Sequence, residues 1–171
     1  MGGVSRLIKG YEDRESAIRM KKMEDKKMET NREHMRLEME SLSRNEEFAR
    51  VVTAVFMSRL DPTLEEVDDV KTAVSEAVTN AVIHGYRGDR GTIYLDLTAD
   101  MEERTLTVAV KDCGVGIADV KQAMEPMFTT DPEGERSGMG FSFMEAFMDQ
   151  VEVESEPNHG TLVTMKKSIG R

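Results

Sequence analysis

Glu76 and Asn80 stand four residues apart in a stretch that is otherwise suited to packing. The run from about Thr63 to Gly85 has apolar residues at three- and four-residue steps, which predicts an amphipathic helix that Gly85 ends. Residues four apart share one face of a helix, so the pair lies together beside the apolar stripe. A carboxylate can act as a base, and a carboxamide oxygen can bind a hard cation. The alternative is that both side chains are simply solvated. The expected buried stripe is Val67, Val70, Val74, Ala77, Val78 and Ala81.

A second candidate site follows an expected strand. Asp112 stands at the end of that strand and precedes Gly114 and Gly116. Two glycines at alternate positions let the backbone turn tightly and approach a ligand closely. A largely buried carboxylate there could accept a hydrogen bond from an exocyclic amine such as that of adenine. By itself the motif is equally compatible with a plain turn that carries a solvated aspartate.

A third candidate site precedes an expected helix that runs to Met148. Gly138 and Gly140 stand at the start of this helix, where free backbone N–H groups and the helix dipole favour an anion. Arg136, just before, could contact a terminal phosphate. The segment 119–137 is expected to be a short helix and then a lid loop. A flexible hinge and a solvated arginine are the plain alternatives.

The remaining elements are expected to position these sites. Alternation of apolar and polar residues predicts strands near 35–40, 93–97, 105–110, 151–154 and 161–165. A helix is expected after Ser43, which precedes Glu46 in a capping pattern, and Thr63 with Glu66 repeats that pattern for the next helix. The helix after Ser43 has apolar residues at helical spacing: Phe48, Val51, Val52, Val55, Phe56 and Leu60.

Composition indicates one charged globular domain. The 171 residues are 39% hydrophobic and 33% charged, with a formal net charge of -10. An acidic chain is poorly suited to a nucleic-acid backbone, so no direct nucleic-acid partner is expected. No apolar run approaches the ~20 residues of a membrane span, and no signal peptide is recognisable, so no membrane partner is expected. The one cysteine suits a reducing cytosol, and the expected location is cytoplasmic.

The first 34 residues differ from the rest, which is expected to form one domain over 35–171. Charged residues of both signs dominate this N-terminal extension, and its apolar residues, among them Met20, Met23 and Met28, are too few to bury a helix face well. It is expected to be disordered or a frayed, solvated helix. A partner-binding arm and a wrongly assigned translation start, with Met28 as the true start, are the alternatives.

Four stretches in this order resemble the motifs of the GHKL superfamily of ATPases, which includes gyrase, Hsp90, histidine kinases and MutL. The stretches are Glu76-x-x-x-Asn80, Asp112-x-Gly114-x-Gly116, Gly138-Met139-Gly140 and Gly160-Thr161. The resemblance implies an α/β (α+β) two-layer sandwich, with helices on one mostly antiparallel mixed sheet, in the Bergerat type of ATP-binding fold. It implies ATP as the cofactor.

Three longer stretches of the sequence resemble one family within this superfamily. "SRNEEFAR", "SEAVTNAVIHGY" and "FTTDPEGERSGMGFSFMEAFMD" are similar to sporulation anti-sigma factors of the sigma-F type, the stage II sporulation protein AB family. The resemblance covers roughly residues 31–167. It implies a homodimeric serine protein kinase that binds and inhibits sigma-F. It also implies that Mg-ATP is used to phosphorylate a serine of the anti-anti-sigma factor, stage II sporulation protein AA.

The resemblance assigns catalytic and partner-binding roles. It implies that Glu76 is the general base and that Asn80 is the Mg²⁺ ligand, with the ATP phosphates completing the metal's shell. Arg136 matches a residue that faces the γ-phosphate. Arg50 matches an arginine used in contacts with sigma-F and with the anti-anti-sigma factor.

The resemblance also assigns the nucleotide contacts. Asp112 matches the carboxylate that reads adenine, Thr161 supports it, and Gly114 and Gly116 form the turn beside the base. The other contacts that it implies are Thr129 and Thr130 in the lid, and Ser137, Gly138, Met139 and Gly140 in the phosphate-facing loop.

Two departures from the family pattern and three alternative functions accompany the resemblance. Asp131 stands where a lysine is common, and the N-terminal extension has no counterpart. The first alternative is an anti-sigma kinase of the general-stress, sigma-B type, and the second is a non-catalytic module that only sequesters sigma. The intact Glu76 argues against the second. The catalytic domain of a histidine kinase is the third, and the sequence offers no phosphoacceptor helix pair for it.

Overall fold

The computed structural model describes residues 31–125 and 139–170. The chain divides between Glu33 and His34, and the part that begins at His34 carries nearly all of the fold. The prediction for residues 1–34 falls mainly on positions outside the described ranges and stays a prediction. The strand expected at 35–40 is present and begins earlier, at Arg32.

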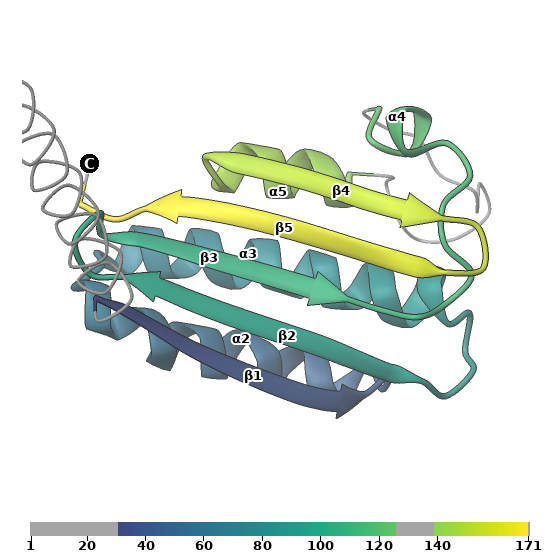
Figure 1. Cartoon of the computed structure of the whole chain (residues 1–171), viewed down its shortest axis with the longest axis horizontal. Helices are drawn as coiled ribbons and strands as arrows, with labels where there is room; N and C mark the ends of the chain where they lie inside the picture. The colour runs from purple at the N-terminus through teal and green to yellow at the C-terminus, as the bar shows by residue number, and fades with distance from the viewer. Residues whose placement is uncertain (1–30, 126–138, 171) are drawn as a thin grey trace, which may run out of the picture. The chain divides into compact units, whose positions relative to one another are not determined.

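A five-stranded sheet forms one layer of the fold, in the order β1-β2-β3-β5-β4. Neighbouring strands run in opposite directions, as their arrows show in Figure 1. The sheet is therefore antiparallel in the part of the chain that the structure describes, and the expected mixed pairing does not occur there. The strands are β1 (Arg32–Glu40), β2 (Thr92–Asp100), β3 (Thr105–Lys111), β4 (Gln150–Glu156) and β5 (Gly160–Ser168).

Helices form the second layer. In Figure 1 α2, α3 and α5 lie behind the sheet, while α4 lies apart from them beside the β4 edge. The inward side chains of β2 and β3 are buried under this layer, and alternate positions are partly exposed, which is the pattern of a sheet covered on one face. The two-layer prediction is therefore confirmed. The helices are α2 (Arg44–Met57), α3 (Leu64–Asn80), α4 (Val120–Ala123) and α5 (Gly140–Phe147).

The local sequence explains the central helix α3. Thr63 caps it: the Thr63 Oγ1 accepts the Glu66 N–H at 3.2 Å, and the Glu66 carboxylate accepts the Thr63 N–H at 2.7 Å. The predicted stripe is buried except for Val67, which is partly exposed, and Val70, Val74 and Val78 are fully inaccessible. Burying side chains of this size stabilises a fold by about 1.5–3 kcal/mol each. Packing and the cap together hold the helix that carries Glu76 and Asn80.

The end of α3 differs from the prediction of one helix to Gly85. The α-helix stops at Asn80 and a π-helical turn, η2 (Ala81–Gly85), follows. A π turn inserts an extra residue into the helical ladder and is common at functional sites. Here it brings the Gly85 carbonyl to the Val115 N–H at 2.9 Å, which ties the helix end to the loop after β3.

The predicted capping box of α2 is wrong. Ser43 has helical backbone angles and makes no capping bond, because the chain already turns at Leu42. The Glu46 carboxylate instead accepts the Ser75 hydroxyl from α3 and pairs with Arg50 Nε at 3.1 Å. This carboxylate therefore links α2 to α3 rather than closing the start of α2.

The apolar residues of α2 divide between two faces. Phe56 is buried, together with Ala49, Thr53 and Met57, whereas Phe48, Val51 and Val55 are exposed by 54%, 52% and 65%. The last three occupy one helix face, since their spacing is three and four residues. A 3₁₀ turn, η1 (Ser58–Leu60), then leads to α3. None of the helices in the described ranges is long and apolar enough to cross a membrane.

Candidate functional site

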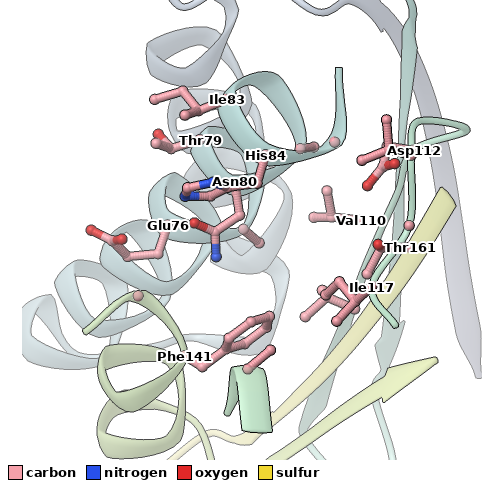
Figure 2. Close-up of a pocket in the computed structure, with 18 of the residues that line it drawn as sticks. Glu76, Thr79, Asn80, Ile83, His84, Val110, Asp112, Ile117, Phe141 and Thr161 are labelled. Atoms are coloured by element: carbon pink, nitrogen blue, oxygen red, sulfur yellow. The ribbon is translucent and has the colours of Figure 1, made fainter. Parts of the chain in front are cut away.

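A cavity of about 1040 Å³ opens between α3, the start of α5 and the loop after β3. This volume is just above the usual range for small-molecule sites, roughly 300–1,000 Å³. Figure 2 shows Glu76 and Asn80 projecting from α3 on one side of the cavity, with Asp112 and Thr161 across from them. The residues singled out in three separate stretches of sequence therefore meet around one space.

The catalytic end, as we name the part around Glu76, Asn80 and Gly140, is held by α3 and α5. Both side chains stand on α3 one turn apart and line the same cavity (Figure 2). A Cβ on Gly140 would lie 3.2 Å from both Glu76 Oε2 and Asn80 Nδ2. The first residue of α5 therefore packs directly against the two functional groups, and glycine leaves them room.

The base end, as we name the part around Asp112 and Thr161, is built where β3 and β5 finish pairing. The Asp112 N–H donates to the Thr161 carbonyl at 2.9 Å and so extends the ladder by one step. The Asp112 carboxylate accepts the Gly114 N–H at 2.8 Å and lies against Gly85, where a Cβ would be 2.9 Å from Oδ1. Only 4% of Asp112 is exposed. Burial raises the pKa of this carboxyl group, and the backbone N–H groups of Gly114 and Thr161 offset part of the rise.

Tyr86 joins the base end to the sheet. Its hydroxyl accepts the Cys113 N–H at 2.9 Å and donates to the Thr92 carbonyl at 2.5 Å. Burial raises the pKa of this phenol, so it stays neutral and able to donate at physiological pH. Gly114 is required beside it, since a Cβ there would lie 2.1 Å from the Gly85 carbonyl. The loop after β3 is thus fixed from both sides.

Ser155 connects three parts of the base end. Its Oγ accepts the Ile117 N–H at 2.8 Å, donates to the Gly160 carbonyl at 2.7 Å and lies 3.0 Å from Thr161 Oγ1. Ser155 and Thr161 are also partners in the β4–β5 register. Gly160 and Gly116 have φ of +83° and +68°, angles that side-chain-bearing residues rarely adopt. Backbone geometry and one hydroxyl together shape this end of the cavity.

Apolar side chains line the space between the two ends. Val110 and Val163 face each other across β3 and β5 in the ladder register. Ile117 and Phe141 approach from the loop after β3 and from α5 (Figure 2). An apolar-lined space that ends at a buried carboxylate fits a purine base with an exocyclic amine. The residues present therefore fit the base of ATP.

Few metal ligands are available in the described ranges, where no group of three or more His, Cys, Asp or Glu side chains is placed to hold a metal ion. Mg²⁺ in phosphate sites commonly takes only one or two protein ligands and completes its shell with phosphate oxygens and water. The Asn80 side-chain oxygen, on the cavity wall beside Glu76, meets that requirement.

Several predicted site residues are brought together and others are not covered. Glu76, Asn80, Asp112, Gly116, Gly140 and Thr161 line the cavity. Gly114 lies in the same loop as Gly116, and Met139, 36% exposed, precedes α5. Arg50 lies on α2, paired with Glu46. The predictions that fall outside the described ranges are Thr129, Thr130, Asp131, Arg136, Ser137 and Gly138.

Sequence reasoning missed other residues of the cavity. Thr79 and Ile83 line it and stand three and seven residues after Glu76, so helical spacing could have identified them. Glu46 and Ser75 line it near the catalytic end, and no pattern signals this, because their contact joins two helices. Gly85 was expected only to end a helix and is also a wall against Asp112.

Comparisons with known proteins agree with this geometry. Residues 39–167 match the family described as Histidine kinase-like ATPase domain. The chain is 55% identical over 135 residues to an Anti-sigma F factor of Clostridium novyi, which covers 79% of this chain and 94% of that protein. It is 52% identical over 139 residues to an Anti-sigma F factor of Geobacillus sp., covering 81% and 94% of the two.

A solved structure supports the fold. The RsbU and RsbW domains of a Mycobacterium tuberculosis protein superpose with a TM-score of 0.58 at 17% identity, over 81% of this chain and 33% of that one. Sequence identity to the curated relatives is far higher and extends across nearly their whole length. The chain therefore belongs to the anti-sigma F factor family and carries a histidine kinase-like ATPase domain.

Proposed function

We propose that this protein binds and inhibits sigma-F and uses Mg-ATP to phosphorylate a serine of its anti-anti-sigma factor, so that it controls sporulation transcription. The observation that carries the kinase part is the catalytic end of the cavity. Glu76 and Asn80 share one side of α3, and both lie against Gly140 at the start of α5. Sigma-F as the partner is inferred from the names of relatives more than 50% identical to this chain, and the anti-anti-sigma factor is inferred from the resemblance of the sequence alone.

The nucleotide orientation follows from the two ends of the cavity. Asp112, with Thr161, is proposed to hold the adenine, because a buried acceptor suits an exocyclic amine. The phosphates then extend toward α5 and Asn80, whose oxygen is proposed to bind Mg²⁺. The phosphate contacts proposed for Thr129, Thr130, Arg136, Ser137, Gly138 and Met139 rest on the resemblance.

Glu76 is proposed as the base that aligns the attacking serine hydroxyl. Phosphoryl transfer requires mainly positioning and charge stabilisation, so a carboxylate beside the terminal phosphate is enough to orient the nucleophile. Glu76 lies one helical turn from Asn80, which places the base beside the metal ligand (Figure 2). Bound Mg²⁺ would supply positive charge to the phosphates.

A phosphoryl-transfer assay tests the proposal. The protein is mixed with labelled ATP, Mg²⁺ and the candidate anti-anti-sigma factor, beside Glu76→Gln and Glu65→Gln. Glu65 is an exposed residue of the same helix, so its variant controls for the loss of a carboxylate on α3. Label on a serine of the partner that is lost only in Glu76→Gln is the expected result. No label from the wild-type protein, with ATP still bound, would favour a non-catalytic module.

The partner surface is proposed to lie on α2. Arg50 is 36% exposed by its side chain and pairs with Glu46, which also receives the Ser75 hydroxyl. The Arg50 guanidinium can contact an acidic group of a partner. Its helix, α2, is joined through Glu46 to α3, which carries the catalytic end. Arg50→Glu is expected to weaken sigma-F binding at least tenfold, whereas the exposed Arg44→Glu on the same helix has little effect. Equal losses in both variants would indicate only a general charge effect.

A homodimer is also proposed, as in the expectation from the sequence. The exposed apolar face of α2, formed by Phe48, Val51 and Val55, supports an interface on this helix. Val55→Lys is expected to lower the mass measured by light scattering from that of a dimer to that of a monomer. An unchanged mass would exclude this face as the dimer contact.

The sigma-B type of anti-sigma kinase is the second candidate, since the chemistry of the cavity would be the same. Binding measured side by side with sigma-F and sigma-B separates the two. The names of the relatives favour sigma-F. The cytoplasmic location expected from the sequence stays a prediction.

A further inference from the structure

The hydroxyl of Ser155 has three close neighbours and only one proton to give. The Ile117 N–H can only donate, so Ser155 Oγ accepts at that contact of 2.8 Å. The Gly160 carbonyl can only accept, so the Ser155 proton goes there, over 2.7 Å. The remaining contact, to Thr161 Oγ1 at 3.0 Å, must therefore be made with a proton from Thr161.

Thr161 then has no proton left for the cavity. Its hydroxyl carries one hydrogen, which is used toward Ser155, and its lone pairs remain for a ligand. The Asp112 carboxylate across the ladder likewise offers only lone pairs when ionised. The two side chains that face the base would both be hydrogen-bond acceptors.

We infer that Ser155 is a specificity-determining residue, which acts by holding the Thr161 hydroxyl proton so that Asp112 and Thr161, the two side chains that face the base, present acceptors only. This inference rests on the proposed placement of the base beside Asp112. Acceptors match the exocyclic amine of adenine and oppose the carbonyl oxygen that guanine carries at the same ring position. These two side chains thus reject guanine because an acceptor would face an acceptor, which leaves buried polar groups unpaired.

Ser155 is a positioning residue, since it contacts Thr161 and two backbone groups rather than the nucleotide. Removing its hydroxyl would free the Thr161 hydroxyl to rotate and donate into the cavity. Guanine would then find a donor, and the preference for adenine would shrink. Ordinary loosening of the loop would instead weaken both nucleotides by similar factors.

Nucleotide binding, measured calorimetrically with ATP, GTP and purine riboside triphosphate in Mg²⁺ buffer, tests this inference without relying on kinase activity. The wild-type protein is expected to prefer ATP over GTP. Ser155→Ala is expected to reduce the ratio of ATP affinity to GTP affinity (the ATP/GTP ratio) by about fivefold or more, which corresponds to the loss of one hydrogen bond. Ser155→Thr, which keeps a hydroxyl, is expected to restore the ratio. Purine riboside triphosphate has no exocyclic group and is expected to change least between variants.

Ser41→Ala is a matched control. The Ser41 hydroxyl also bridges two backbone groups, donating to the Asp89 carbonyl at 3.0 Å and accepting the Gly91 N–H at 2.8 Å, and Ser41 is not among the described residues that line the cavity. Its loss is expected to lower stability and to leave the ATP/GTP ratio unchanged. If Ser155→Ala does not fold, Ser155→Cys carries the same expectation, because a thiol is a weak acceptor.

The double variant decides whether Ser155 acts through Thr161. In a Thr161→Val background Ser155→Ala is expected to change the ATP/GTP ratio less than twofold. A narrowing of the same size in both backgrounds, or an unchanged ratio in Ser155→Ala alone, would overturn the inference. Asp112→Asn tests separately the proposal that the base lies beside Asp112. An unchanged ATP/GTP ratio in that variant would show that the base does not lie there.

Discussion

The base end and the catalytic end of the cavity are built in different ways. At the base end, backbone groups hold the functional side chain: Asp112 accepts the Gly114 N–H, and its own N–H completes the ladder with Thr161. At the catalytic end, Glu76 and Asn80 project from one helix and meet Gly140 of another. One end is part of the folded framework, whereas the other is assembled by the packing of two helices.

This difference predicts which property each end controls. Changes at the base end should alter nucleotide affinity and the stability of the fold together, because the same bonds serve both. Changes at the catalytic end should alter metal dependence or transfer rate and leave the fold intact. Four substitutions test this division.

The largest effect is expected for Gly160→Ala at the base end. A Cβ there would lie 2.1 Å from the Asp112 carbonyl oxygen, and φ is +83°. Strain of about 1–2 kcal/mol from the backbone angle adds to a clash that moves Asp112. We expect a loss of unfolding free energy of about 3–5 kcal/mol in urea titrations and no measurable ATP binding.

Gly88→Ala separates strain from clash in that experiment. Gly88 has φ of +91° and no atom within 4 Å of the added Cβ, so only the backbone strain applies. It is expected to cost about 1–2 kcal/mol and to leave ATP binding unchanged. Equal losses in the two variants would contradict the role given to the Asp112 contact.

Asp112→Asn is expected to weaken ATP binding by about 10–100-fold and to stabilise the protein without nucleotide. Burial raises the pKa of Asp112 in the folded state, so the ionised carboxylate lowers the stability of the folded protein above that pKa. As pH falls from above the raised pKa toward the ordinary value, the folded protein takes up this proton first. The stability advantage of the variant should therefore shrink with falling pH.

Thermal unfolding of the Asp112→Asn variant and of the wild-type protein across that pH window checks the sign. Asp68→Asn, which neutralises an exposed aspartate of α3, is measured beside it as the control for a general change of charge. A stability advantage of Asp112→Asn that grows as the pH falls would contradict this expectation, because it would show that the ionised carboxylate stabilises the fold.

Asn80→Ala is expected to lower ATP affinity about tenfold in Mg²⁺ and hardly at all in EDTA, because only the metal contact is lost. Calorimetric titration under both conditions gives the comparison within one variant. Unfolding free energy should change by about 0.5 kcal/mol or less if the catalytic end is separate from the framework. An unchanged Mg²⁺ effect would remove Asn80 from the metal site.

The smallest effect is expected for Gly140→Ala. Its Cβ would press on Glu76 and Asn80 at 3.2 Å, which requires shifts of a few tenths of an ångström. Small displacements of positioned groups reduce rate more than binding, so a fall of about three- to tenfold in transfer is expected with ATP affinity within twofold. Alanine is favoured over glycine in a helix, so stability should not fall. A large loss of affinity would mean that the two ends are not separable.

The sequence was sufficient to predict the features that depend on short-range patterns of residues. The apolar period of α3, its Thr63 cap and the hairpin strands are confirmed, because burial and capping act over a few residues. The meeting of Glu76, Asn80, Asp112 and Thr161 followed from a motif set rather than from periodicity. Contacts between distant elements, such as that of Glu46 with Ser75, leave no local pattern, which explains why the capping prediction at Ser43 was wrong.

The first long helix shows the limit of periodicity in another way. Apolar residues recur along α2, yet Val51 and Val55 are exposed while Phe56 is buried. A helical period identifies faces but not which of two apolar faces the sheet covers. Only the packing against α3 and β2 decides this, and the uncovered face then becomes a candidate for a partner.

The π-helical turn at Ala81–Gly85 makes the site sensitive to residue number rather than residue identity. One residue changes the direction of a helical side chain by about 100°, so the extra residue sets the angle at which Gly85 reaches Asp112. Deleting a single residue between Asn80 and Gly85 would restore a regular helix and turn this wall away from the carboxylate. Across related chains, insertions and deletions should therefore be excluded here even where substitutions at Val82 or Ile83 are accepted.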